Sequence, residues 1–112
     1  MRLKKPAQFQ AVFDDNDLRV STPQVLILAK RNRLAHPRLG LVMRKKFVRM
    51  ACERNTIKRI LRESFRLRQG DIAGLDLVMM TRQGADRLNR KELRKLVENA
   101  FDTLVRRNAE LA

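Results

Sequence analysis

The strongest chemical signal in this sequence is a run of basic residues between positions 44 and 69. The segment reads RKKFVRMACERNTIKRILRESFRLRQ and contains ten Lys or Arg residues but only two acids, Glu53 and Glu63. Ten positive and two negative charges give it a formal charge of +8, more than half of the +14 carried by the whole chain. Guanidinium groups bind phosphate oxygens through paired hydrogen bonds, and ammonium groups bind them as point charges. This local concentration predicts a binding site for a polyanion such as RNA.

A helix would sort this segment into two faces. With about 100° between successive residues, its inward-facing stripe would consist of Ile57, Ile60, Leu61, Ser64 and Phe65. The opposite side, called here the basic arc, would consist of Asn55, Lys58, Arg59, Arg62 and Arg66. Like charges at i, i+4 spacing repel each other, so this arrangement favours phosphates on the arc, where Asn55 could also contact a base or a sugar hydroxyl. A merely solvated face usually mixes both signs of charge, which makes that interpretation the weaker one.

Composition limits the other functions of this chain of 112 residues. The single cysteine, Cys52, excludes an internal disulfide and suits a reducing cytoplasm; we interpret it as structural. The single histidine, His36, excludes a His-pair metal site, and we interpret it as an exposed loop residue. The longest apolar run, 25–29, is far shorter than the roughly 20 residues that span a membrane. The N-terminus lacks the apolar region of a signal peptide, so we expect none.

The acidic residues do not form a convincing metal site. Asp14, Asp15 and Asp17 could attract Mg²⁺, but a turn after a helix explains their spacing equally well. The remaining acids are scattered along the chain. We therefore predict neither a protein-bound metal nor a catalytic side chain.

Periodicity and turn residues predict three helices and four strands. Helices are expected at 6–14, at 48–69 and from about residue 90, and strands at 18–21, 24–29, 39–43 and 75–80. Met50 would extend the apolar stripe of the second helix, Gly70 would end it, and Asn89 with Glu92 would cap the third. The order α-β-β-β-α-β-α favours an α+β fold, a two-layer sandwich with helices packed on a mixed four-stranded sheet. Because no linker or repeat divides the chain, we predict one RNA-binding domain over residues 1–112.

Three stretches together match the motifs of one known family. Residues 54–66 read RNTIKRILRESFR, residues 39–46 read LGLVMRKK, and residues 9–13 read FQAVF. They resemble the RNR motif (R-N-R-x-K-R-x-x-R-E-x-F-R), the strand ending in Lys-Lys and the F-x-x-V-F helix of the bacterial ribonuclease P protein component, in the same order and spacing. Thr56 departs from the motif, which usually has Arg there. Since it lies off the basic arc, we expect its lack of charge to reduce RNA affinity rather than abolish binding.

The resemblance implies a function as well as a fold. The family's protein pairs with a catalytic RNA subunit, and together they remove the 5′ leader from precursor tRNA by endonucleolytic hydrolysis. The RNA subunit performs the reaction with Mg²⁺, so the protein would supply no catalytic residue. The chain would then belong to a cytoplasmic ribonucleoprotein whose partners are the RNA subunit and the leader, and not DNA or a membrane. The resemblance also implies a left-handed βαβ crossover, although general rules favour a right-handed one.

The resemblance further assigns RNA-binding residues. A cleft between the first helix and the sheet would be lined by Phe9, Phe13 and Lys46. It would be bordered by Arg54, Asn55 and Arg62. Phosphates of the leader or of the RNA subunit would contact Lys45, Arg49, Lys58, Arg59 and Arg66. Periodicity alone favours core packing for both Phe residues, and run 25–28 offers no aromatic residue to stack on a base, so less stacking is expected than in fuller versions of the family site.

Three other classes of protein fit the high positive charge and the motifs of this sequence less well. A ribosomal protein would share the size and charge but would not need the RNR-like block and the F-x-x-V-F helix together. A DNA-binding regulator would need a helix-turn-helix pair, whereas strands flank the basic helix here. A stand-alone nuclease would need clustered carboxylates for metal ions or a His pair.

Overall fold

Four strands form one mixed sheet in the order β1-β2-β4-β3. The computed structural model describes residues 2–111. β1 (Leu18–Ser21), β2 (Val25–Arg31) and β4 (Leu75–Thr81) pair antiparallel, and β3 (Arg38–Val42) runs parallel to β4. Most side chains of the two central strands, β2 and β4, are buried on both faces, which explains their nearly continuous apolar runs.

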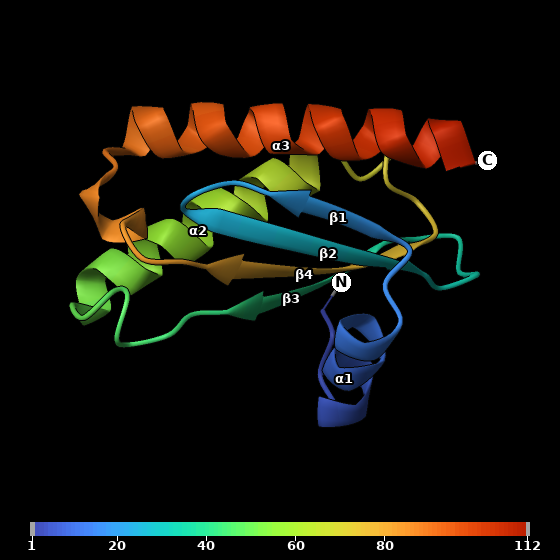
Figure 1. Cartoon of the computed structure of the whole chain (residues 1–112), viewed down its shortest axis with the longest axis horizontal. Coiled ribbons are helices and arrows are strands. Elements are labelled where there is room, and N and C mark those ends of the chain that lie inside the picture. The colour runs from blue at the N-terminus through green and yellow to red at the C-terminus, as the bar shows by residue number, and fades with distance from the viewer. Residues whose placement is uncertain (1, 112) are drawn as a thin grey trace.

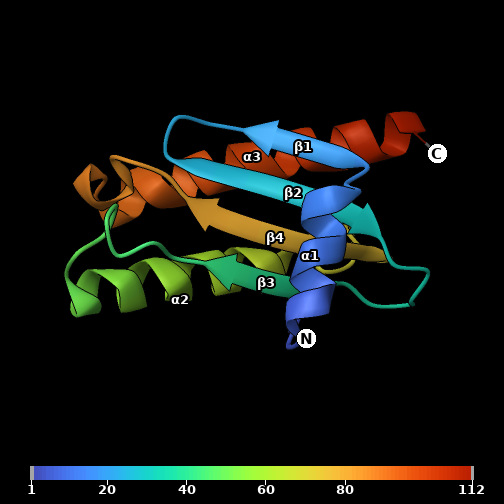
Figure 2. The same ribbon diagram turned by 60° about the horizontal axis from the view of Figure 1, so that its bottom comes forward.

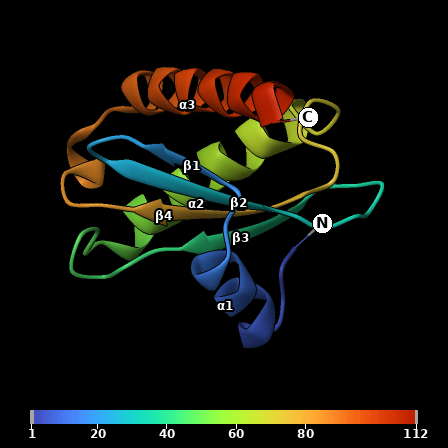
Figure 3. The ribbon, with the colours of Figure 1, turned by 45° about the vertical axis from the view of Figure 1, so that its right-hand side comes forward.

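Helices cover both faces of this sheet, to different extents. α2 (Ala51–Leu67) and α3 (Arg90–Leu111) lie on one face, and α1 (Pro6–Asp14) crosses part of the other (Figure 1). The larger core lies under α2 and α3, and a smaller cluster of Leu3, Val12, Leu28 and Val78 lies under α1. The predicted element order and mixed sheet are confirmed, and α1 adds a partial layer on the second face. Figure 3 shows α1 standing apart from the other two helices.

The connection from β3 to β4 has the uncommon hand. Both strands point the same way, and α2, which joins them, lies behind the sheet when α1 is in front (Figure 2). Passing from β3 through α2 to β4 in this view describes a left-handed crossover, as the resemblance implied and against the general preference.

α2 differs from its prediction at both ends. Its inward stripe of Ile57, Ile60, Leu61, Ser64 and Phe65 is buried as predicted. The helix begins only at Ala51, however, and Met50 is 58% exposed, so the extension of the stripe to Met50 was wrong. The helix ends at Leu67, before Gly70, and positive φ occurs at Gly74 and Gly84 rather than at Gly70.

The start of α3 follows the prediction closely. The backbone N–H of Glu92 donates to Asn89 Oδ1 at 2.8 Å, and the backbone N–H of Asn89 donates to Glu92 Oε1 at 3.0 Å. These reciprocal bonds form the predicted capping box and satisfy two N–H groups that the first turn leaves unpaired.

Two ion pairs fix the ends of β2, β3 and β4. Asp76 of β4 is buried and accepts hydrogen bonds from Arg38 Nε at 2.7 Å and Nη2 at 2.6 Å, and these bonds raise the pKa of Arg38. Asp15, just after α1, accepts a 2.7 Å hydrogen bond from Lys30, which lowers the pKa of Asp15 below its ordinary value. His36 lies in the turn before β3 and is partly buried rather than exposed, which corrects the sequence-based interpretation.

Candidate nucleic-acid interface

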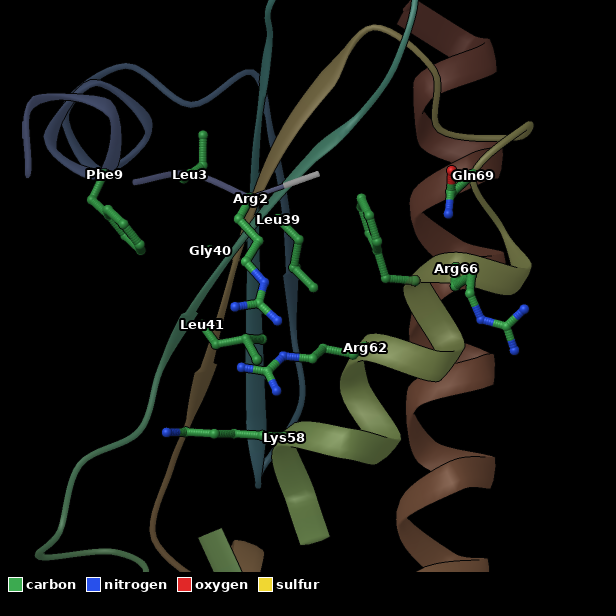
Figure 4. A pocket seen from close by; sticks show the side chains of 11 residues that line it. Arg2, Leu3, Phe9, Leu39, Gly40, Leu41, Lys58, Arg62, Arg66 and Gln69 are labelled. Atoms are coloured by element: carbon green, nitrogen blue, oxygen red, sulfur yellow. The ribbon is translucent and has the colours of Figure 1, made fainter. Parts of the chain in front are cut away.

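A groove of about 350 Å³ opens between α1, β3 and α2. Its apolar lining consists of Leu3, Phe9, Leu39, Gly40, Leu41 and Phe65. Its polar lining consists of Arg2, Lys58, Arg62, Arg66 and Gln69. Within the described part of the chain no acidic residue lines it. Figure 4 shows the side chains of Lys58 and Arg62 reaching from α2 toward β3. A groove with an apolar floor, whose charged lining residues are all positive, suits a phosphate-bearing ligand.

The position of Phe9 depends on a glycine in β3. A Cβ atom added at Gly40 would lie 2.7 Å from Phe9 Cζ and closer still to Cε1, so the aromatic ring packs directly on the strand backbone. A glycine inside a strand often marks such a close approach. Gly40 therefore allows Phe9 to be partly buried while it still lines the groove.

We expect Gly40→Ala to displace the Phe9 ring. The added methyl group overpacks the contact, so the free energy of unfolding should fall by about 1–3 kcal/mol, and affinity for single-stranded RNA should fall with it. Urea denaturation and a binding titration would measure both. Gly70→Ala is the matched control, because a Cβ there meets nothing within 4 Å. Equal effects of the two substitutions would contradict this account of Phe9.

The basic arc is present as predicted from helical geometry. Asn55, Arg59, Arg62 and Arg66 are exposed, and Lys58 is partly buried where it lines the groove. None of the ion pairs found within residues 2–111 involves a cation of the arc. Glu63, a possible partner of Arg59, instead lies 3.5 Å from Arg94 of α3. All charged residues of the arc are therefore positive and lack an acidic partner within residues 2–111. Three of them line the groove: Lys58, Arg62 and Arg66.

Arg54 has a different position from the other motif residues. Its Nη1 donates to the backbone oxygens of Val48 at 2.9 Å and Arg49 at 2.7 Å. It does not line the groove. Its guanidinium group fixes the segment before α2, which is a structural contribution that the sequence motif does not reveal.

Three predicted RNA-binding cations lie in the segment that Arg54 fixes. Lys45, Lys46 and Arg49 are exposed, and Lys46 Nζ is 5.0 Å from the centroid of the Phe47 ring. The fully buried Val48 anchors the segment in the core. These cations precede the N-terminal end of α2 and do not line the groove, so they form a second basic surface that is separate from the groove.

Phe13 lines an apolar sheet face rather than the groove. Leu26, Met80 and Val42 are neighbours in one register row across β2, β4 and β3. They are partly buried, as Phe13 is, and pack with it against the cluster under α1. Phe9 packs against the same cluster and also lines the groove, so it joins the two surfaces. As expected from run 25–28, the row contains no aromatic residue.

The groove residues that sequence reasoning missed include Arg2, Gly40 and Gln69. Only Gly40 carried a signal, because glycine is unusual inside a strand. Arg2 lies far from α2 in the sequence, and Gln69 lies beyond the end of the helix. Nothing in their local pattern indicates that they meet.

The described residues also bear on metal binding and on membrane-spanning helices. Residues 2–111 hold no group of three or more His, Cys, Asp or Glu side chains that could bind a metal ion. In the same part of the chain, no helix combines the length and the apolar character needed to cross a membrane. The guanidinium and ammonium groups that line the groove are suited to binding phosphates.

Comparisons with known proteins agree with the resemblance. A family model described as Ribonuclease P matches residues 1–105. The ribonuclease P protein component of Histophilus somni (strain 2336) is 43% identical over 106 residues, which cover 95% of this chain and 88% of that protein. The RNase P protein of Staphylococcus aureus superimposes with a TM-score of 0.84 at 29% identity, over 92% of this chain and 94% of that one. For the RNase P protein of Thermotoga maritima the TM-score is 0.70 at 29% identity, over 88% and 96%. On this evidence the chain belongs to the ribonuclease P protein family.

Proposed function

We propose that this chain binds the RNA subunit of ribonuclease P and the 5′ leader of precursor tRNA, and so promotes removal of the leader. Family membership gives the coarser part of this function: the chain acts in tRNA processing, as the protein component of a ribonucleoprotein endonuclease. The finer part, which concerns the two RNA contacts and their residues, is our proposal.

The observation that carries the proposal is the single sign of the charges around the groove. The cations of the basic arc have no acidic partners within residues 2–111, although many acids are available elsewhere on the surface. Binding to RNA releases counterions from the phosphates, and each neutralised phosphate adds to affinity at low salt. A surface of this kind favours RNA over a neutral or basic partner.

The two surfaces beside α1 suit an extended single strand. Single-stranded RNA is bound by a basic groove combined with faces on which bases can rest. The groove supplies Lys58 and Arg62. Phe9 lines the groove and also packs against the same cluster as Leu26, Val42 and Met80, which form the sheet face. The leader would therefore lie along α1, and the second basic surface with Lys45, Lys46 and Arg49 would remain available to the RNA subunit.

Catalysis is assigned to the RNA subunit in this proposal. Phosphodiester hydrolysis with Mg²⁺ needs carboxylate or phosphate oxygens around the metal, and RNA itself provides phosphate oxygens. The described residues offer no cluster of carboxylates. The protein would contribute binding and orientation, and we place the complex in the cytoplasm, where an exposed thiol such as Cys52 stays reduced.

Reconstitution tests this proposal directly. The protein alone should leave precursor tRNA intact, whereas the protein added to its RNA subunit at low Mg²⁺ should accelerate cleavage over that by the RNA subunit alone. Gel analysis of 5′-labelled precursor would measure both rates. A precursor with its leader removed to one nucleotide is the control and should gain little affinity from the protein. Cleavage by protein without RNA, or no acceleration of the RNA subunit, would refute the proposal.

A further inference from the structure

The N-terminal segment before α1 is firmly fixed at the edge of the sheet. Arg2 forms a parallel bridge with Leu39 of β3, and the backbone N–H of Leu3 donates to the Leu39 oxygen at 2.9 Å. The Leu3 side chain is only 5% exposed and belongs to the cluster under α1. The backbone N–H groups of Lys4 and Lys5 donate to Gln8 Oε1 at 2.7 and 3.0 Å. Arg2 is thus held at a defined place beside β3.

This anchoring brings Arg2 opposite the cations of α2. Figure 4 shows the guanidinium groups of Arg2 and Arg62 converging over Leu41, with the Lys58 side chain just beyond them, whereas the Arg66 guanidinium points away. Arg2 comes from the N-terminal segment and the other two come from α2, so the cations approach from two walls of the groove. Three positive groups that converge without an acid repel one another, and an anion between them would relieve that repulsion.

The volume and the lining residues of the groove indicate which kind of anion it could hold. Its volume of about 350 Å³ lies near the lower end of the roughly 300–1,000 Å³ typical of small-molecule pockets. That space suits one nucleotide and is too small for a duplex. Two guanidinium groups can donate paired hydrogen bonds to one phosphate, while Phe9 and the strand Leu39–Leu41 offer an apolar surface to a sugar or a base.

We infer that this groove holds a single unpaired nucleotide of RNA, with its phosphate clamped between Arg2 on one side and Arg62 and Lys58 on the other. The inference rests on the proposed function and extends it by adding the N-terminal segment to the RNA site. The nucleotide belongs either to the leader or to the RNA subunit, since both present the same phosphate chemistry.

The test uses Arg2→Ala with Arg33→Ala as a matched control. Both side chains are exposed, both changes remove one positive charge, and Arg33 lies in the loop before β3, outside the groove. Binding is measured in two arms: the free protein to the RNA subunit, and the assembled holoenzyme to precursor tRNA with and without its leader. Arg2→Ala should weaken binding about tenfold in at least one arm, while Arg33→Ala should stay within about twofold of the wild type. A loss in the first arm assigns the nucleotide to the RNA subunit, and a loss that requires the leader assigns it to the leader.

Two further variants separate a clamp from general charge. Arg2→Lys should recover only part of the affinity, because an ammonium group keeps the charge but cannot donate two parallel hydrogen bonds. Losses from Arg2→Ala and Arg62→Ala should be non-additive when combined, whereas losses from Arg2→Ala and Arg59→Ala should multiply. If Arg2→Ala matches Arg33→Ala in both arms while the wild type binds RNA, the inference is overturned and the proposed function stands. If the wild-type protein binds neither RNA, both are overturned.

Discussion

Arg62→Ala should weaken RNA binding by the protein by about tenfold to a hundredfold at low salt and should flatten the salt dependence of binding. Arg62 is exposed, has no acidic partner within residues 2–111 and reaches into the groove. Loss of a charge-assisted hydrogen bond costs roughly 1.5–3 kcal/mol, and loss of one phosphate contact lowers the slope of log affinity against log salt by about one unit. Filter binding at several salt concentrations would measure both quantities.

Two further variants test whether the effect is specific to cations of the basic arc. Arg59→Ala should have a similar effect on the slope, because Arg59 is also an unpaired member of the basic arc. Arg68→Ala is the control: Arg68 is already occupied by Asp102 at 2.7 Å and by Asp71 at 3.3 Å, so the slope should change little. An unchanged slope for both Arg62→Ala and Arg59→Ala would mean that the arc faces only solvent.

Asp76→Ala should destabilise the fold by about 2–4 kcal/mol. The Asp76 carboxylate is 6% exposed and accepts hydrogen bonds from Arg38 and from Asn32 Nδ2, the latter at 2.8 Å. Its removal leaves the partly buried Arg38 guanidinium without an acidic partner, and an unpaired charge that is shielded from water is costly. The expected loss is a large fraction of the roughly 5–15 kcal/mol that stabilises an ordinary domain. Urea denaturation at neutral pH would measure the change.

Two variants show whether the lost partner or the lost volume causes the effect. Asp71→Ala removes an exposed carboxylate whose pair with Arg68 is also exposed, and the free energy of unfolding should change by less than about 1 kcal/mol. Combining Asp76→Leu with Arg38→Leu should cost less than Asp76→Ala alone, because no buried charge is left unpaired. An Asp76→Ala protein as stable as the Asp71→Ala protein would show that the buried pair does not hold β3 to β4.

The parts of the fold that local sequence determines were predicted well. The helix Pro6–Asp14 and the strand Leu18–Ser21 have the expected bounds, and the stripe and arc of α2 follow from helical periodicity alone. Errors arose where distant residues decide the structure. β2 extends to Arg31 because Lys30 and Arg31 pair with Asp76 and Leu75 of β4, which an apolar run cannot indicate. α2 begins only at Ala51 because residues 45–47 form a turn and Arg54 bonds the backbone oxygens of Val48 and Arg49, which follow it.

The candidate site was predictable only along α2. The arc is a property of one helix, so its residues could be grouped from their spacing. The groove needs the N-terminal segment, β3 and α2 to meet, and no local pattern reveals that Arg2 lies beside Arg62. Thr56 does lie off the arc as predicted: its hydroxyl donates to the Cys52 oxygen at 3.0 Å and it borders a different hollow, beside Ala85 and Asn89.

The two backbone bonds made by Arg54 have a consequence for genetic variation in this chain. One guanidinium group bonds the backbone oxygens of Val48 and Arg49, directly after the turn that carries Lys45 and Lys46, whether or not it touches RNA itself. A substitution of Arg54 would therefore disturb the same segment as substitutions within it. The effect of combining such substitutions should be smaller than the sum of their single effects. We therefore expect positions 48, 49 and 54 to be coupled, so that the effect of a replacement at one of them depends on the residues at the other two.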